Sequence, residues 1–217
     1  TALASSEDRQ REFLMSVSHE LRTPMTSIKG YAEALADGVI EPNELRSVGE
    51  VLLSEGDRLD RLVSDLLDLS RTGAVDFRLD MVETDLTEIA RQAAATWSLR
   101  CAKSNLDFAS AIPSHPLLIH ADPTRVRQII DNLIENAVRV TPDGGTVQLN
   151  CVDTASGPRL SIEDNGPGLT DDDIEVAFQP AVLNSRYRNA RQVGTGLGLA
   201  LVGRLATRMN AIAVAGH

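Results

Sequence analysis

Two long amphipathic stretches constrain the fold of this 217-residue chain more than any other feature of its sequence. From residue 14 to 35 and from 45 to 69, apolar side chains recur at alternating spacings of three and four residues, with interruptions at Pro24 and Glu55. This spacing is typical of α-helices that bury one face. A short break containing Gly38 and Pro42 indicates a turn. The sequence therefore predicts an antiparallel helical hairpin over residues 1–72.

The apolar stripes of this hairpin are too wide for two helices to cover each other completely. Val63 and Leu67 broaden the second stripe further. Pairing two hairpins into a four-helix bundle would bury both stripes, so we expect a homodimer formed through the hairpin. Packing of the stripes against the remainder of the same chain stays open as an alternative.

The pattern changes after Gly73, where short β-type segments alternate with helical ones. Strands are expected near residues 81–84, 106–112, 117–120, 146–152 and 160–162, and helices after Asp85, after Asp122 and over 200–209. Mainly antiparallel strands with helices in this order predict a two-layer α/β sandwich. The expected fold is thus α+β, with a hairpin domain at 1–72, a linker at 73–78 and a second domain at 79–217.

Composition excludes several classes of partner and site. The formal net charge of −10 argues against nucleic acid, because binding to phosphate backbones needs a basic surface. Cys101 and Cys151 belong to no Cys-x-x-Cys or Cys/His cluster, so we expect buried free thiols and no zinc or redox site. No run of about eighteen apolar residues is present, so we expect no membrane contact by this stretch of chain.

His19 lies off the apolar stripe of the first helix and should face outward. Glu20 is its neighbour, and Thr23 lies one turn farther along the same face. A carboxylate beside an exposed imidazole can hold the proton of one ring nitrogen and leave the other as a nucleophile. Pro24 removes a backbone N–H just past this position and should bend the helix. Periodicity alone strongly favours the simpler interpretation, an ordinary solvated histidine on the helix surface.

Three segments of the second domain could together bind an anionic ligand. Asn132 and Asn136 project from one helix face, and the turn Asp164-Asn-Gly-Pro-Gly168 follows a strand. The loop Gly194-Thr-Gly-Leu-Gly-Leu199 precedes a helix, whose N-terminus favours negative charge. Each segment alone is weak evidence, and the loop fits neither the P-loop nor the dinucleotide fingerprint.

These motifs together resemble those of sensor histidine kinases. Ser-His-Glu-Leu-Arg-Thr-Pro over 18–24, followed by Thr-Ser-Ile-Lys-Gly-Tyr over 26–31, resembles the phosphoacceptor box. The three ligand-binding segments resemble the N, G1 and G2 boxes of the family's ATP-binding domain, whose fold is shared with gyrase-type and Hsp90-type ATPases. The resemblance implies ATP and Mg²⁺ as cofactors, autophosphorylation of His19, and phosphotransfer to an aspartate of a response-regulator receiver domain.

The resemblance also implies roles for individual residues. His19 would be the nucleophile, and Asn136 would bind Mg²⁺ with Asn132 beside it. Arg139 would contact phosphate, and Asp164 would accept a hydrogen bond from the adenine amine. The rest of the implied nucleotide site is Gly166 and Gly168 near the base, with Arg191, Gly194, Thr195, Gly196, Leu197 and Gly198 near the phosphates.

Two further functional features follow from the same resemblance. Residues 170–193 would form a lid over ATP, with Phe178 as its aromatic residue and with Arg186, Arg188 or Arg191 reaching the γ-phosphate. The spacing Glu20-x-x-Thr23 resembles the family's phosphatase motif, in which Thr23 would orient water against the regulator's aspartyl phosphate.

The sequence departs from the family pattern at two places. Val140 stands where Tyr or Phe is usual, so a stacking contact near the nucleotide is expected to be missing. Residues 210–217 come before the position of the family's last strand, so the second domain is expected to lack it. The resemblance also implies that the chain is a cytoplasmic fragment of a membrane-bound sensor protein.

Three alternative functions remain open. A non-catalytic signalling scaffold would bind ATP without phosphorylating His19. A gyrase-type or Hsp90-type ATPase would release phosphate in turnover, and a serine-directed anti-sigma kinase would modify a hydroxyl group. Neither of the last two accounts for the sequence around His19.

Overall fold

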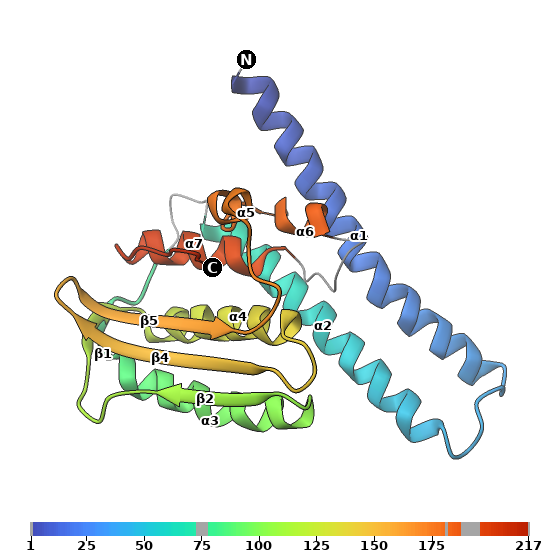
Figure 1. The fold of residues 1–217 in the computed structure, drawn as a ribbon. Coiled ribbons are helices and arrows are strands. Elements are labelled where there is room, and N and C mark those ends of the chain that lie inside the picture. The colour runs from blue at the N-terminus through green and yellow to red at the C-terminus, as the bar shows by residue number, and fades with distance from the viewer. Residues whose placement is uncertain (1, 73–77, 181, 188–195, 217) are drawn as a thin grey trace. The chain divides into compact units, whose positions relative to one another are not determined.

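The computed structural model describes residues 2–72, 78–180, 182–187 and 196–216 (Figure 1). Its internal contacts divide the chain into two compact units, Thr1–Ser70 and Arg71–His217. We describe each unit separately.

The first unit is a helical hairpin, as predicted. Helix α1 spans Ala2–Ala36 and helix α2 spans Leu45–Thr72. The helix assignment of α1 continues through Pro24, whose side chain is fully buried. Gly38 ends α1 with a φ of +67°, and the N–H of Val39 donates to the carbonyl of Ala34 at 3.1 Å. This is the hydrogen bond of a Schellman cap, which needs a residue that tolerates left-handed backbone and so favours glycine.

The hairpin leaves many apolar side chains exposed in the single chain. Val17, Val48 and Leu62 are buried, in agreement with the inward faces predicted for the two helices. Other large apolar side chains remain open to solvent, and Leu53 is 71% exposed. The others include Leu14, Met15, Met25, Val63 and Leu67. Because soluble proteins rarely leave so many large apolar side chains open to solvent, this exposure is consistent with the expected pairing of two hairpins.

The second unit contains two small sheets. Strand β1 (Val82–Asp85) pairs antiparallel with β3 (Leu118–Ala121). The larger sheet has the order β2-β4-β5, in which β2 (Asp107–Ala111) is parallel to β4 (Thr146–Thr154), and β4 is antiparallel to β5 (Gly157–Asp164). The expectation of mainly antiparallel pairing is therefore confirmed, with β2 as the exception.

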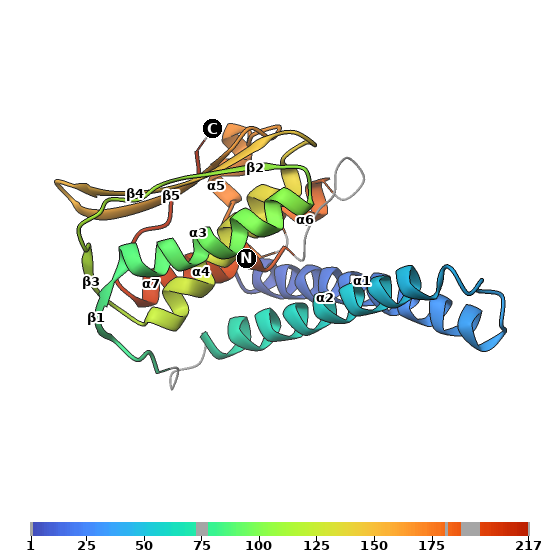
Figure 2. The ribbon, with the colours of Figure 1, turned by 90° about the horizontal axis from the view of Figure 1, so that it is seen from below.

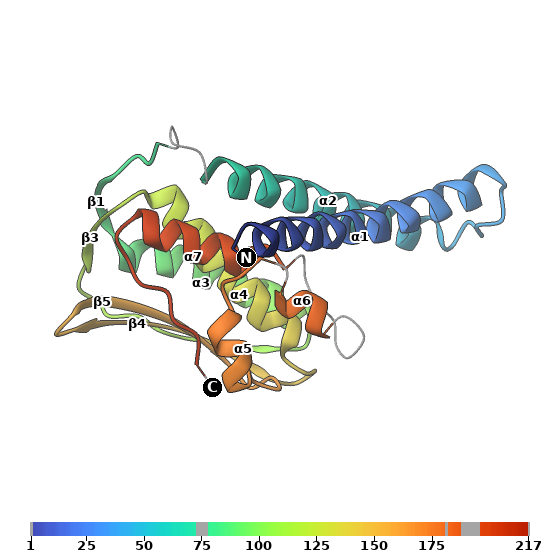
Figure 3. The ribbon, with the colours of Figure 1, turned by 90° about the horizontal axis from the view of Figure 1, so that it is seen from above.

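Three helices cover one face of the larger sheet, which makes the unit a two-layer sandwich (Figure 2). They are α3 (Leu86–Lys103), α4 (Pro123–Val140) and α7 (Gly198–Arg208). The core between the layers is aliphatic, because Ile130 and Ile134 of α4, Leu149 of β4, and Leu201 and Leu205 of α7 have no exposed surface. Figure 3 shows α4 and α7 side by side, and these helices contact each other.

Two short helices of the second unit were not predicted from the sequence. They are α5 (Asp171–Val176) and α6 (Val182–Tyr187), and both fall in the stretch expected to form a lid. Both contain only six residues, too few for hydrophobic periodicity to distinguish them from a loop.

Asp85 caps α3 and joins it to the loop before β3. Its Oδ1 accepts hydrogen bonds from the N–H of Thr87 at 2.9 Å, from the hydroxyl of Thr87 at 2.7 Å and from the N–H of Leu117 at 3.2 Å. Burial alone would raise the pKa of Asp85, but these hydrogen bonds to the charged form outweigh burial and lower the pKa below its usual value.

We predict that Asp85→Ala lowers the free energy of unfolding of this unit by about 1 to 2 kcal/mol at pH 7, because three donors lose their acceptor. Since the folded-state pKa is lowered, this contribution is complete above the unfolded pKa of about 3.9 and is lost as the pH falls further. Urea denaturation over a pH series measures the difference. The exposed Asp153 provides the control variant Asp153→Ala. An Asp85→Ala effect that is lost while the pH is still well above 4, or that does not decrease as the pH falls well below 4, would contradict the account.

Candidate functional site

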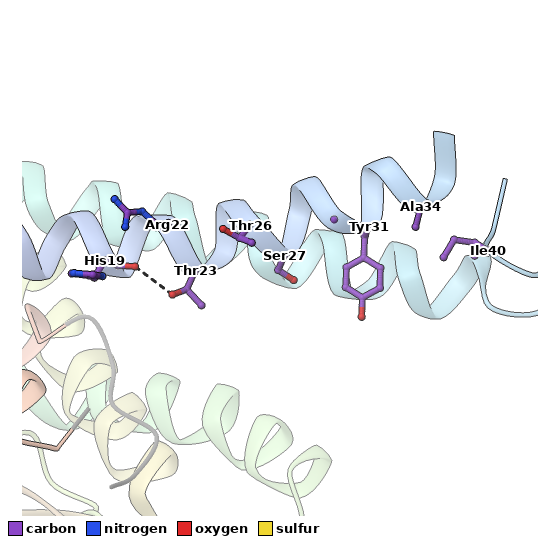
Figure 4. A pocket seen from close by; sticks show the side chains of 9 residues that line it. His19, Arg22, Thr23, Thr26, Ser27, Tyr31, Ala34 and Ile40 are labelled. Atoms are coloured by element: carbon purple, nitrogen blue, oxygen red, sulfur yellow. Dashed lines mark hydrogen bonds between the residues drawn. The ribbon is translucent and has the colours of Figure 1, made fainter. Parts of the chain in front are cut away.

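His19 lies exposed on α1 beside a shallow groove on the hairpin (Figure 4). The hydroxyl of Thr23 donates to the backbone carbonyl of His19 at 3.3 Å, so the two residues occupy consecutive turns of one face. The groove continues from them along α1 toward the hairpin turn and is lined mainly by small or hydroxyl-bearing side chains. Besides His19 and Thr23, it includes Arg22, Thr26, Ser27 and Tyr31.

Glu20 points away from this groove and toward α2. Its side chain is only 10% exposed, and its Oε2 accepts a hydrogen bond from Nη2 of Arg58 at 3.4 Å. Nη1 of Arg58 lies 3.9 Å from Oε2 of Glu55. Within the described ranges, no hydrogen bond joins the ring of His19 to Glu20. The predicted pairing of the two side chains is thus not made in this conformation, and the role of Glu20 stays a prediction.

The first of the three segments predicted to bind a ligand, which contains Asn132, lies against the third, which contains Gly198. Asn132 and Asn136 are half-buried on α4, and Nδ2 of Asn132 donates to the carbonyl of Gln128 at 3.0 Å. A Cβ atom at Gly198 would lie 2.8 Å from Oδ1 of Asn132, closer than non-bonded atoms approach. Glycine at the start of α7 therefore lets the amide of Asn132 approach the backbone of the third segment.

The second segment packs against the other end of α4. Oδ1 of Asp164 accepts from the N–H of Gly166 at 2.9 Å, and the Asp164 side chain is exposed. A Cβ at Gly166 would lie 2.9 Å from the carbonyl oxygen of Val140. Gly168 has a φ of +69°, which few other residues tolerate. The structure thus brings all three predicted segments to α4, with residues 132 and 140 separated by about 12 Å along the helix axis.

The N-terminus of α7 is suited to bind an anion. Leu197 occupies the N-cap position with a fully buried apolar side chain, which cannot accept hydrogen bonds from the first N–H groups of the helix. Gly196 precedes it with a φ of +67°. Nη2 of Arg139 on α4 donates to Oε1 of Glu135 at 3.2 Å. Three other predicted residues, Arg191, Gly194 and Thr195, lie outside the described residues, as does Arg188.

A buried aspartate that the sequence analysis missed joins α5 to α6. Asp173 has no exposed surface, forms a capping box with Thr170, and accepts hydrogen bonds from Arg186 and Tyr187. Burial alone would raise its pKa, but the donors outweigh burial and hold the pKa of Asp173 well below its usual range. The spacing Thr170-x-x-Asp173 was the available sequence signal, because it is that of a capping box. Arg186, a candidate for phosphate contact, is ion-paired here.

Phe178 anchors the same region to α7. A Cβ at Gly203 would lie 3.0 Å from the Cβ of Phe178 and 3.3 Å from its Cγ. The absence of a side chain at Gly203 therefore gives the aromatic side chain its place against the helix. Sequence alone could not identify this pairing, since the two residues are joined only by the tertiary fold.

Among the described residues, we also looked for metal sites, reactive cysteines and membrane-spanning helices. Across those ranges, no group of three or more His, Cys, Asp or Glu side chains is arranged to hold a metal ion. Cys101 and Cys151 are free and buried, and burial raises the pKa of both thiols. None of the described helices combines the length and apolar character needed to cross a membrane.

Two protein families match separate parts of the chain. The family described as "His Kinase A (phospho-acceptor) domain" matches residues 9–74, which contain His19. The family described as "Histidine kinase-, DNA gyrase B-, and HSP90-like ATPase" matches residues 121–216, which contain α4, the Asp164 turn and α7. Together the two matches include every residue that the sequence analysis assigned to a site.

Curated relatives carry the same combination over nearly the whole chain. Sensor histidine kinase WalK of Bacillus subtilis is 31% identical over 199 residues, which cover 90% of this chain and 32% of WalK. Signal transduction histidine-protein kinase BaeS of Escherichia coli is 30% identical over 219 residues, which cover 100% of this chain and 46% of BaeS. The chain therefore spans less than half the length of these relatives.

A solved structure shares the fold. Histidine kinase ThkA, in its complex with the response regulator protein TrrA, matches with a TM-score of 0.69 over 97% of this chain and 61% of the ThkA chain. At 24% sequence identity, this match supports the arrangement of helices and strands alone.

We predict that Asp173→Asn loosens α6 without unfolding the rest of the unit, because it removes the charged acceptor of Arg186 and Tyr187. Losing hydrogen bonds to a charged group should increase amide exchange in α6 by roughly ten- to a hundredfold. Hydrogen exchange followed by mass spectrometry measures this effect, with the exposed neighbour variant Asp172→Asn as control. Equal exchange in the two variants would contradict the role assigned to Asp173.

Proposed function

Because this chain belongs to the protein histidine kinase family, we propose that it is the catalytic core of a two-component sensor kinase. In this proposal it transfers the γ-phosphoryl group of ATP to His19 and then to an aspartate of a response regulator. One observation carries the proposal: an exposed histidine in the phosphoacceptor-type unit is joined, in the same chain, to an ATPase-type unit whose three ligand-binding segments meet along α4.

The arrangement along α4 supports a defined orientation of ATP. The adenine amine would donate to the exposed carboxylate of Asp164, at the Val140 end of the helix. The phosphates would lie about 12 Å away near Asn132, with Gly196, Leu197 and Gly198 presenting the N-terminus of α7 to them. An extended nucleotide can bridge that separation. Arg139 would leave Glu135 and bind a phosphate oxygen instead, which would bring its positive charge to the phosphates.

Asn132 and Asn136 fit a magnesium site next to the phosphates. Amide oxygens are hard ligands that Mg²⁺ accepts together with phosphate oxygens. The observation that supports the fit is the space left by Gly198, which allows Oδ1 of Asn132 to lie at the start of α7. The metal would supply charge neutralisation for the transferred phosphoryl group.

His19 would act as the nucleophile. A ring nitrogen attacks the γ-phosphorus, the N–P bond forms as the P–O bond to ADP breaks, and ADP leaves. The other ring nitrogen keeps its proton, and Glu20 is the carboxylate proposed to hold that proton. The exposed position of the ring suits both proposed steps, because ATP must reach it in the first and the regulator must reach it in the second.

Homodimerisation and regulator binding are proposed for the hairpin. The exposed apolar side chains of α1 and α2, among them Leu53 and Met25, support pairing with a second hairpin. The groove that begins at His19 and continues past Thr26 and Tyr31 supports docking of a receiver domain next to the phosphorylated ring. ThkA, whose structure was solved with a response regulator, offers a precedent for such a complex.

We also propose the domain division 1–72, 73–78 and 79–217, and a cytoplasmic position within a longer membrane-bound sensor. The division of contacts near residue 70 supports the first proposal. The relatives support a place within a longer sensor protein, since the chain corresponds to 32% of sensor histidine kinase WalK and 46% of BaeS. The cytoplasmic and membrane-bound parts of the proposal come from the family resemblance.

Incubation with γ-labelled ATP and Mg²⁺ tests the kinase proposal. We predict an acid-labile, alkali-stable label on the native chain and none on His19→Gln, because only a phosphorylated nitrogen has this stability pattern. The matched control is His115→Gln, which removes an exposed imidazole from the other unit and should label normally.

Each other outcome favours a different function. ATP binding without label indicates a signalling scaffold, and phosphate release without protein labelling indicates an ATPase. Acid-stable label indicates phosphorylation of a hydroxyl group. Label that persists in His19→Gln would remove His19 from the mechanism.

Thr23→Ala tests the proposed phosphatase activity. We predict that labelling of His19 changes by less than about twofold, whereas dephosphorylation of the regulator slows by roughly tenfold or more, because water loses its orienting hydroxyl. The control is Thr207→Ala, whose hydroxyl donates to the carbonyl four residues earlier, as that of Thr23 does. Equal loss of both activities in Thr23→Ala would contradict the assignment.

A further inference from the structure

Arg22 lies on α1 one helical turn after His19 and lines the same groove (Figure 4). Both side chains are exposed. Because a guanidinium stays protonated at every physiological pH, Arg22 is the one permanent cation among the residues that line this groove. The other lining residues, apart from His19, are uncharged: they are Thr23, Thr26, Ser27, Gly30, Tyr31, Ala34 and Ile40.

Arg22 has no carboxylate partner within the described ranges, where it forms neither a hydrogen bond nor an ion pair. The helix itself supplies none, because no acidic residue lies three or four positions away. The residues at those positions are Ser18, His19, Met25 and Thr26. By contrast, Lys29 on the same helix pairs with Glu33 at 3.5 Å. In a chain with a net charge of −10, the donors of Arg22 are thus available to another anion.

The geometry of the helix brings Arg22 within reach of a group attached to His19. Side chains three residues apart on an α-helix have their Cβ atoms about 5 to 6 Å apart. Each Cα–Cβ bond tilts toward the helix N-terminus, so a long side chain at position 22 extends over the turn that carries His19. Thr23 follows the same direction, since its hydroxyl donates to the carbonyl of His19 at 3.3 Å.

Phosphorylation of His19 would place a strong anion in this groove. A protein-bound phosphoryl group carries three acceptor oxygens and a charge of roughly −1.5 to −2 at pH 7. A guanidinium can bind two such oxygens through parallel hydrogen bonds, and its fixed planar geometry suits a phosphoryl group better than a single ammonium does. The hydroxyl groups of the groove can donate hydrogen bonds, but they supply no compensating charge.

We propose that Arg22 is a further catalytic residue, which binds the phosphoryl group as it is transferred to His19 and holds it in the phosphorylated chain. The N–P bond to the ring forms while the P–O bond to ADP breaks, and ADP leaves. Arg22 exchanges no proton and forms no covalent bond; its guanidinium donates hydrogen bonds to the phosphoryl oxygens. This inference rests on the proposed kinase function and adds a residue to its mechanism.

The position of Arg22 on the acceptor side distinguishes its role from that of Arg139. Arg139 belongs to the unit proposed to bind ATP, so its contact with phosphate would end when the phosphoryl group has left the nucleotide. Arg22 belongs to α1 and would stay beside the phosphorylated ring of His19. The contact is therefore expected in the phosphorylated chain without ATP and without a regulator.

Phosphorus NMR of the full 217-residue chain, phosphorylated with phosphoramidate, tests this contact directly. Phosphoramidate transfers its phosphoryl group to exposed imidazoles and releases ammonia, so ATP is not needed. The signal of phosphorylated His19 is identified by its loss in His19→Gln. A neighbouring guanidinium favours the dianion and lowers the pKa of the phosphoryl group, so Arg22→Gln should raise the midpoint of its pH titration by about half a pH unit at low salt. Arg22→Lys, which keeps the charge, should recover most of this shift.

The rate of autophosphorylation supplies the second measurement. With saturating ATP and Mg²⁺ and no regulator present, Arg22→Gln should label His19 about tenfold more slowly, because the transferred group loses a charged donor. The KM for ATP should stay unchanged, since Arg22 is proposed to bind the transferred phosphoryl group and not the bound nucleotide.

The chain offers controls for both measurements. Arg46→Gln removes another exposed arginine of the hairpin, one paired with Glu50 at 3.1 Å, and should change neither the midpoint nor the rate. His115 and His120 are exposed in the other unit, so their phosphorylated forms are internal references whose midpoints should not respond to Arg22→Gln. Thermal unfolding should be the same for Arg22→Gln and the native chain, because the side chain makes no contact that stabilises the fold.

The proposed function and this inference fail in distinguishable ways. A native chain that ATP never labels refutes the kinase proposal, while the titration after phosphoramidate treatment still decides whether Arg22 binds the phosphoryl group. Equal midpoints in Arg22→Gln and the native chain would overturn the inference alone. Equal midpoints together with slower transfer to a regulator would assign Arg22 to docking of the regulator instead, and a shifted midpoint with an unchanged labelling rate would overturn its part in the transfer.

Discussion

The burial of one face of α4 is the constraint on which the nucleotide-binding side of this chain depends. Ile130 and Ile134 are completely enclosed between the helices and the sheet, which fixes the rotation of α4. Asn132 and Asn136 must then face the opposite side, where Gly198 meets Asn132 and Gly166 meets the carbonyl of Val140. Packing of aliphatic side chains thus fixes the direction in which these polar side chains project.

Three arginines of this acidic chain that lie in or near the proposed sites are paired with carboxylates. Arg58 contacts Glu20, Arg139 contacts Glu135, and Arg186 contacts Asp173. A phosphate or a catalytic carboxylate can therefore recruit such an arginine only by exchange of partners, which costs less than uncovering an isolated buried charge. For Arg139, such an exchange is the step by which its charge would reach the phosphates in the proposed kinase function.

Short sequence patterns, such as helix caps and glycine-rich motifs, were enough to predict most of the fold and the residues of the candidate site. Asp85 and Asp122 were recognisable as helix starts, and the glycine and asparagine segments pointed to a bound anion. The direction of Glu20 was not predictable, because its partner Arg58 lies 38 residues away and only the packing of α1 with α2 brings them together. The same holds for Phe178 and Gly203, and α5 and α6 are too short to show periodicity.

The central claim is that the ATPase-type unit transfers phosphate to one histidine of the hairpin. Peptide mapping by mass spectrometry tests it most directly, on chain incubated with ATP and Mg²⁺ and kept at alkaline pH throughout digestion. The account predicts a single phosphorylated peptide, with the phosphoryl group on His19. Phosphate on any other residue, or ATP consumed while every peptide stays unmodified, would contradict it.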